Sequence, residues 1–220
     1  MMRPGGSMHV DIWSDIVCPW CYLGKCHLEQ ALASFEHRDE VTVRYRSFEL
    51  DPSFPAGAEQ PVAAVLAAKY GMSAVQAREA EAGLAAKAVA DGLEFTADRA
   101  MGNTFDAHRL VHFAADHGMQ GPLLGRLYQS YFGQGRPVFA AADLVLLAAG
   151  AGLDPGDAAR VLDDGSYSGA VRADEAEART LGISGVPFFV IDRRYGISGA
   201  QPAQALAGAL QSAWDGRVGE

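Results

Sequence analysis

The sequence predicts an α/β fold that is interrupted by a large all-helical insertion. Three observations support this prediction: two alternating segments near the start flank a helical pattern, the middle of the 220-residue chain shows no convincing strand, and strand patterns return only near the end. Because 49% of the residues are hydrophobic, the chain can bury a full core.

The first predicted elements are a strand, a helix and a second strand. Residues 9–13 alternate in polarity, and a helical pattern runs from Pro19 to about Phe35. Residues 41–48 alternate again, so that every second side chain, beginning with Val41, lies on the same face. Together these segments form a β-α-β unit.

Residues 51–57 end this unit, because two prolines and a glycine cannot continue a central strand. From residue 60 to about 182, alanine-rich and leucine-rich segments separated by glycines indicate about six or seven short helices. Two helix starts carry capping residues, Asn103-Thr104 and Asp154-Pro155.

The last part of the chain returns to strands. Residues 186–192 form an apolar run that indicates a buried strand, residues 195–198 its hairpin partner, and residues 202–214 a helix. The order β-α-β, helical block, β-β-α is that of a thioredoxin fold with an inserted helical domain. We therefore expect a discontinuous thioredoxin domain at 8–52 and 183–216, and the inserted helical domain at 53–182.

Charge and hydropathy exclude several classes of function. The net charge of -9 argues against a general affinity for nucleic acid or anionic membrane, because both attract clustered Lys and Arg. No apolar run approaches the roughly 20 residues needed to cross a bilayer, and none of signal-peptide length follows the first residues. We expect a soluble protein of the reducing cytoplasm that binds neither nucleic acid nor membrane.

Chemistry is concentrated in the cysteines, all of which fall between residues 18 and 26. Cys18 and Cys21 are three residues apart on the predicted helix, so their Cα atoms lie about 5 Å apart, within the span of a disulfide. The helix N-terminus favours a thiolate at Cys18. We expect Cys18 to be the exposed attacking thiol and Cys21, on the core-facing side, to be the resolving thiol.

The third cysteine, Cys26, points away from Cys21 on a helical wheel. Its Cα would lie about 8.6 Å from that of Cys21, which is too far for a disulfide without a kink near Gly24. Cys26 is therefore either an inert thiol or a redox modulator. A metal site made with His27 is disfavoured, because one helix cannot easily wrap four donors around an ion, and we expect no metal.

Two further features belong to the same chemistry. Pro187 opens the strand after the helical block, the place where thioredoxin folds keep a cis-proline facing the cysteine pair. The backbone of Val186 would then be free to pair with an extended substrate. A buried carboxylate often assists proton transfer from the resolving thiol in this fold, and the sequence offers Asp11 and Asp15 as alternatives.

Four segments of the chain carry a resemblance to a known family: Cys18–Lys25, Phe48–Pro52, Asn103–Leu110 and Gly185–Phe189. On these segments the chain resembles DsbA-family thiol-disulfide oxidoreductases of the FrnE-like branch. It is also similar to 2-hydroxychromene-2-carboxylate isomerases and kappa-class glutathione transferases, whose motif has serine where this sequence has Cys18.

The resemblance implies dithiol-disulfide exchange with protein or small-molecule disulfides, with no cofactor and with glutathione as a candidate redox partner. It also implies a cleft between the two domains. The candidate substrate-binding residues are then Pro19, Trp20, Val186, Asn103, His108 and Arg109.

Two other hypotheses remain open at the level of the sequence. One is a glutathione-dependent isomerase or transferase that acts on an aromatic substrate in the interdomain cleft. The other is a non-catalytic holdase that binds unfolded chains on apolar interdomain surface.

Overall fold

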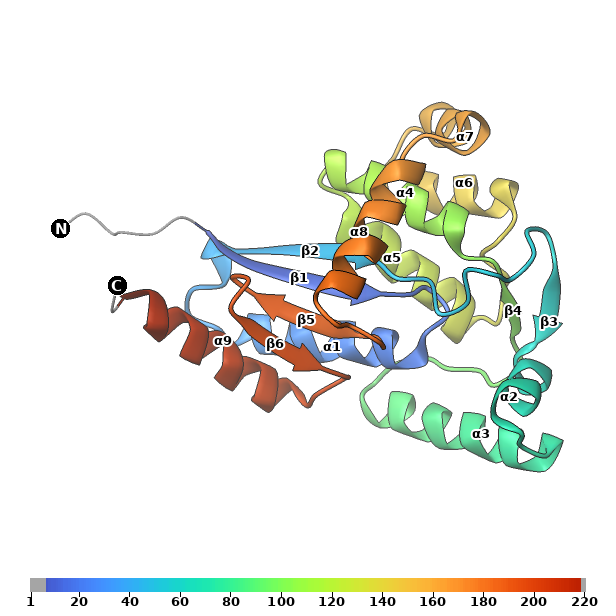
Figure 1. The fold of residues 1–220 in the computed structure, drawn as a ribbon, viewed down its shortest axis with the longest axis horizontal. Coiled ribbons are helices and arrows are strands. Elements are labelled where there is room, and N and C mark those ends of the chain that lie inside the picture. Colours follow the sequence, from blue (N-terminus) through green and yellow to red (C-terminus); the bar gives the residue numbers. More distant parts are fainter. Residues whose placement is uncertain (1–6, 219–220) are drawn as a thin grey trace. The chain divides into compact units, whose positions relative to one another are not determined.

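The structure is a computed structural model that describes residues 7–218, and these fold into two compact units (Figure 1). The first unit contains the described residues up to Phe48 and those from Asp174 onward, and the second contains Glu49–Ala173. Within the described residues, no helix is both long and apolar enough to cross a membrane.

The first unit is built on a four-stranded sheet in the order β2-β1-β5-β6. Strand β1 runs parallel to β2 and antiparallel to β5, and β5 pairs with β6 as an antiparallel hairpin. The bounds of the strands are β1 Met8–Ser14, β2 Val41–Ser47, β5 Phe188–Ile191 and β6 Tyr195–Ser198. The predicted α/β fold, with strands from both ends of the chain, is confirmed.

Helices α1 (Pro19–Ala33) and α9 (Ala203–Val218) of this unit pack against each other. A short 3-10 helix, Arg38–Glu40, follows α1. The ring of Trp214 on α9 stacks on that of His37, with the ring centroids 4.0 Å apart. These aromatic contacts hold the last helix against the segment that joins α1 to β2.

One face of β1 packs against α1. Ile12 on β1 lies opposite Phe189 on β5, so the two side chains share a face of the sheet. The ring of Phe189 is 3.3 Å from the place that a Cβ at Gly24 of α1 would occupy. Because side chains two residues apart on a strand point the same way, Ser14 also lies on the α1 face.

The opposite face of β1 packs against α8 (Ser168–Thr180). The indole N–H of Trp13 donates to the backbone carbonyl of Asp174 at 2.9 Å. The carboxylate of Asp174 accepts from Arg46 at 3.0 Å and from the backbone N–H of Ser47 at 2.9 Å, and Arg46 also donates to Asp11 at 2.7 Å. These bonds tie the second half of α8 to the sheet, which explains why the first unit resumes at Asp174, earlier than the expected junction at 182/183.

The second unit is mostly helical. Its helices, besides the start of α8, are α2 Val62–Tyr70, α3 Ala74–Ala90, α4 Phe105–Asp116, α5 Gln120–Tyr128, the π-helix Gln129–Gly133, α6 Ala141–Gly150 and α7 Pro155–Asp164. The large side chains of its core include Leu110, Leu123, Tyr128, Tyr131 and Phe132.

The second unit also contains a small sheet that the sequence analysis did not expect. Strands β3 (Glu59–Pro61) and β4 (Ala100–Gly102) pair antiparallel. Each has only three residues, which is too short for a two-residue alternation to stand out from the neighbouring helices.

The two predicted helix starts in this unit differ in their chemistry. The carboxylate of Asp154 accepts from the N–H of Asp157 at 2.8 Å, with proline at the first helical position, so this cap is confirmed. At the start of α4, Thr104 is the N-cap but makes no capping bond with its side chain. Asn103 takes that role, because its side-chain oxygen accepts from the N–H of Phe105 at 3.0 Å.

Candidate active site

Cys18 is the N-cap residue of α1, and Pro19 follows it in the first turn. The carbonyl of Cys18 accepts from the N–H groups of Cys21 at 3.0 Å and Tyr22 at 3.3 Å, and its own N–H donates to the carbonyl of Asp15 at 3.2 Å. The backbone on both sides of Cys18 is therefore fixed by hydrogen bonds, as a site with one defined geometry requires.

Both cysteines of the pair are buried free thiols, so the structure represents the dithiol form. Cys18 is 3% exposed and Cys21 is 2% exposed, and the expectation that Cys18 is exposed is therefore wrong for this form. Its Sγ donates to the backbone carbonyl of Val186 at 3.5 Å, in a loop that covers it. Trp20, at 40%, is the exposed residue of the motif.

The loop that carries Val186 lies directly against the second turn of α1. The peptide bond between Val186 and Pro187 is cis. A Cβ built at Gly24 would lie 2.9 Å from the Cγ of Pro187, closer than real contacts allow. Gly24, which was expected only as a place for a kink, is therefore needed for the close approach of α1 to this loop.

The electrostatics of the pair are asymmetric. Burial raises the pKa of the Cys21 thiol well above its ordinary value, and the hydrogen bond to Cys18 and the charge of Cys18 raise it further. The Ser14 hydroxyl and the backbone N–H of Asp15, which donate to the Cys21 sulfur, act in the opposite direction. Cys21 therefore remains a thiol that donates to Cys18.

The structure separates the two candidate proton relays. Asp11 lies on the α8 face of β1, where its carboxylate is bound to Arg46 at 2.7 Å, and so it is not placed to exchange a proton with the pair. Asp15 is 1% exposed and its backbone contacts both Cys18 and Cys21. Ser14 is a site residue that the sequence pattern did not predict, although its position two residues after Ile12 on the strand indicates the α1 face.

Cys26 lies further along the same helix. It is partly exposed, and its sulfur accepts from the side-chain amide of Gln30 at 3.4 Å. Helix α1 runs without interruption from Pro19 to Ala33, so the kink near Gly24 that a bridge to Cys21 would require is not present.

Asn103, His108 and Arg109 belong to the second unit, and the contacts of Asn103 and Arg109 within that unit are structural. Asn103 links α4 to the carbonyl of Phe54 at 2.8 Å. The guanidinium of Arg109 donates to Asp106 and to backbone carbonyls at and after the end of α7, those of Val161, Leu162 and Ser166. These bonds close the end of α7, a role that the family resemblance did not imply.

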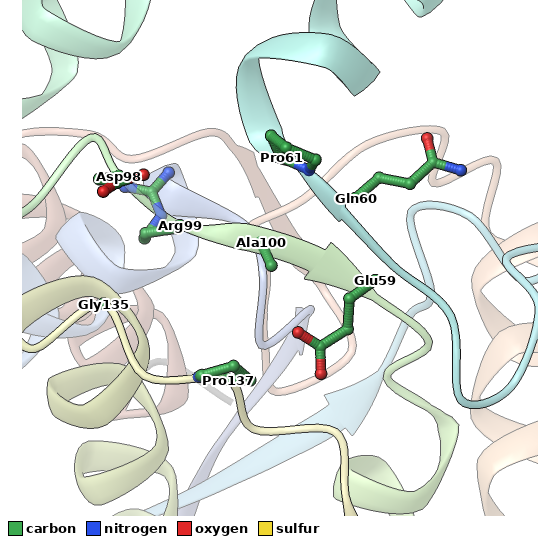
Figure 2. Close-up of a pocket in the computed structure, with 8 residues that line it drawn as sticks. All are labelled: Glu59, Gln60, Pro61, Asp98, Arg99, Ala100, Gly135 and Pro137. Atoms are coloured by element: carbon green, nitrogen blue, oxygen red, sulfur yellow. The ribbon is translucent and has the colours of Figure 1, made fainter.

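A shallow hollow of about 290 Å³ in the second unit contains none of the expected site residues (Figure 2). It is lined by residues of the paired strands β3 and β4 and of nearby segments: Glu59, Gln60, Pro61, Asp98, Arg99, Ala100, Gly135 and Pro137. Between residues 7 and 218 no group of three or more His, Cys, Asp or Glu side chains is arranged to hold a metal ion. The cysteine pair at the start of α1 is thus the candidate active site.

The chain is similar to several proteins of known structure. A probable DsbA oxidoreductase from Streptomyces coelicolor is 53% identical, with a TM-score of 0.90, and the match covers 94% of this chain and 90% of that one. The cytosolic disulfide reductase DsbM from Pseudomonas aeruginosa, in a structure with GSH, shares the fold at 20% identity and a TM-score of 0.60, over 94% and 99% of the two chains. A 2-hydroxychromene-2-carboxylate isomerase also shares the fold. It is 15% identical, with a TM-score of 0.71, and the match covers 93% of this chain and 95% of that one.

The model of one family, the DSBA-like thioredoxin domain, matches residues 9–211 and so includes strands and helices of both units. With Cys18 capping α1 and Pro187 packed on the same helix, this chain belongs to the DSBA-like thioredoxin domain family.

Proposed function

We propose that this protein is a thiol-disulfide oxidoreductase that exchanges the Cys18/Cys21 dithiol-disulfide with disulfides of proteins or small molecules. The observation that carries the proposal is the placement of two free thiols in the first turn of one helix, with Cys18 at the N-cap and Cys21 hydrogen-bonded to it. A helix N-terminus favours a thiolate, which is the species that attacks a disulfide.

The proposed reaction has two steps. The Cys18 thiolate attacks one sulfur of the substrate disulfide and displaces the other as a thiolate, which leaves a mixed disulfide at Cys18. Cys21 then attacks the Cys18 sulfur and displaces the second substrate thiol. The products are two substrate thiols and a Cys18–Cys21 disulfide, and the opposite direction would oxidise a substrate dithiol.

Substrate would bind beside the pair, where Trp20 offers exposed aromatic surface and Pro19 and Val186 lie next to Cys18. Glutathione is the small thiol that we propose as redox partner, and the presence of GSH in the DsbM structure supports this choice. The proposed compartment is the cytoplasm, in line with the description of DsbM as a cytosolic reductase.

The test is reduction of insulin by the protein with dithiothreitol or glutathione as electron donor. We expect the parent to accelerate insulin reduction and Cys18→Ser to reduce the rate to the uncatalysed level, while Cys26→Ser retains it. Unchanged turnover in Cys18→Ser would contradict the proposal. Glutathione conjugation or isomerisation that persists in Cys21→Ala, together with no disulfide reduction by the parent, would favour the isomerase or transferase hypothesis instead.

A further inference from the structure

The resolving step requires Cys21 to lose a proton inside a buried site. In the dithiol form, two of the influences that oppose this loss come from Cys18, namely its hydrogen bond and its charge. Once Cys18 is bound to substrate in a mixed disulfide, its sulfur no longer carries a negative charge. Burial then remains as the main obstacle, and the groups that donate to the Cys21 sulfur become decisive.

Ser14 is one of these donors. It is the last residue of β1, it is 5% exposed, and its side chain lies on the sheet face that packs against α1, the same face as Ile12. Its hydroxyl donates to the sulfur of Cys21. Because a rigid strand holds Ser14, this donor is in place before the reaction begins.

Carboxylates are less suitable for this role. Asp11 is on the other face of β1 and is held by Arg46. Asp15 acts on Cys21 through its backbone N–H, and a side-chain substitution leaves that donor unchanged. The hydroxyl of Ser14 is therefore a side-chain donor to Cys21 that persists through the resolving step.

We propose that Ser14 is a positioning residue for resolution, and that its hydroxyl holds and stabilises the Cys21 thiolate as this attacks the mixed disulfide. The inference rests on the proposed function. In the step, the Cys21–Cys18 S–S bond forms and the bond between Cys18 and the substrate sulfur breaks. The substrate thiolate leaves with the electron pair and takes up the proton that Cys21 has lost, so no further oxidant or reductant is needed.

The first experiment separates the two chemical steps. The reduced protein is mixed with an aromatic disulfide whose released thiol absorbs light, in single-turnover stopped flow, and the mixed disulfide is followed by acid quench and mass spectrometry. In Ser14→Ala we expect attack by Cys18 at the parental rate and resolution about tenfold slower, because a hydrogen bond to a charged group is lost. Ser14→Thr, which keeps the hydroxyl, should recover most of the rate.

Ser130→Ala is the matched control, since it removes a buried hydroxyl from the second unit. It should leave both steps unchanged. Equal rates of resolution in the parent and in Ser14→Ala would overturn the inference while leaving the proposed function intact. A parent that forms no mixed disulfide would instead contradict the proposed function, and the second experiment would then decide the role of Ser14.

The second experiment does not depend on turnover. In a Cys18→Ala, Cys26→Ala background, Cys21 is the remaining thiol, and its ionisation can be followed by thiolate absorbance against pH. Adding Ser14→Ala should move the midpoint upward by about one pH unit, because the thiolate loses its hydroxyl donor. Adding Ser130→Ala should not move it. An unchanged midpoint in the Ser14→Ala variant would show that the hydroxyl does not act on Cys21.

Discussion

The two faces of β1 use their polar residues in different ways. On the α8 face, Arg46 forms ion pairs with both Asp11 and Asp174, at 2.7 and 3.0 Å. On the α1 face, the thiol of Cys21 is hydrogen-bonded to Cys18 and to the hydroxyl of Ser14. The α8 face therefore uses ion pairs to hold the helix to the sheet. The α1 face carries thiol and hydroxyl groups, which can take part in proton transfer.

The α8 face should give the largest effect on stability. Asp174→Ala removes the acceptor of Arg46 and of the Ser47 N–H, and leaves a largely buried cation with one partner fewer. We expect a loss of about 3 kcal/mol in the free energy of unfolding, because breaking a buried pair costs that much. Urea denaturation followed by circular dichroism measures it.

The matched control is Glu177→Ala, since Glu177 lies on the same helix but 3.9 Å from Arg46 and is more exposed. It should cost less than about 1 kcal/mol. Similar losses in the two variants would show that the Asp174 contacts do not hold the sheet to α8. Cys18 reactivity toward an aromatic disulfide should be unchanged in either folded variant.

On the α1 face, packing is the sensitive property. Gly24→Ala places a Cβ 2.9 Å from Pro187, and we expect a loss of about 2 kcal/mol from this overpacking, with altered Cys18 reactivity as the loop moves. Gly83→Ala on α3 is the control, because outside its own stretch of helix no atom lies within 4 Å of the new Cβ. It should raise stability by about 0.5 to 1 kcal/mol, as alanine favours helix. Equal shifts in thermal melting would refute the close approach.

The smallest expected effect concerns pH and belongs to Cys21. Because folding raises the pKa of its thiol, the folded protein keeps the proton where the unfolded chain has released it. Stability from this group is complete below the ordinary thiol pKa of about 8.5 and falls above it, with a slope of up to about 1.4 kcal/mol per pH unit.

Urea titrations of the reduced protein between about pH 7 and 9, below the range where tyrosine and lysine titrate, measure this slope. Cys21→Ala should lose it. The same slope in that variant would assign the pH dependence to other groups.

Part of this organisation was predictable from the sequence. The alternation in residues 9–13 and 41–48 predicted β1 and β2, and the spacing of Cys18 and Cys21 predicted the candidate site, because these signals are local. The role of Gly24 was not predictable, since it depends on a loop near the other end of the chain.

The contacts of Asp174 were hidden for the same reason. Its backbone carbonyl accepts from the Trp13 indole, which lies 161 residues earlier in the sequence. Nothing in the local sequence of α8 indicates that the helix is divided between the two units. Ser14 was missed because a serine at a strand end has no distinctive pattern. The sequence alone could not assign these partners, because only the folded chain brings them together.

The discontinuity of the first unit has a consequence for biosynthesis. Strand β1 has β2 as its neighbour early in translation, but its other neighbour, β5, lies beyond the whole second unit. The helical residues 49–173 are contiguous and leave the ribosome before β5 does. Until β5 has been synthesised, one edge of β1 has no strand to pair with, and the loop that contacts Cys18 is missing. The cysteines of the nascent chain therefore stay uncovered after the residues of the helical unit have left the ribosome.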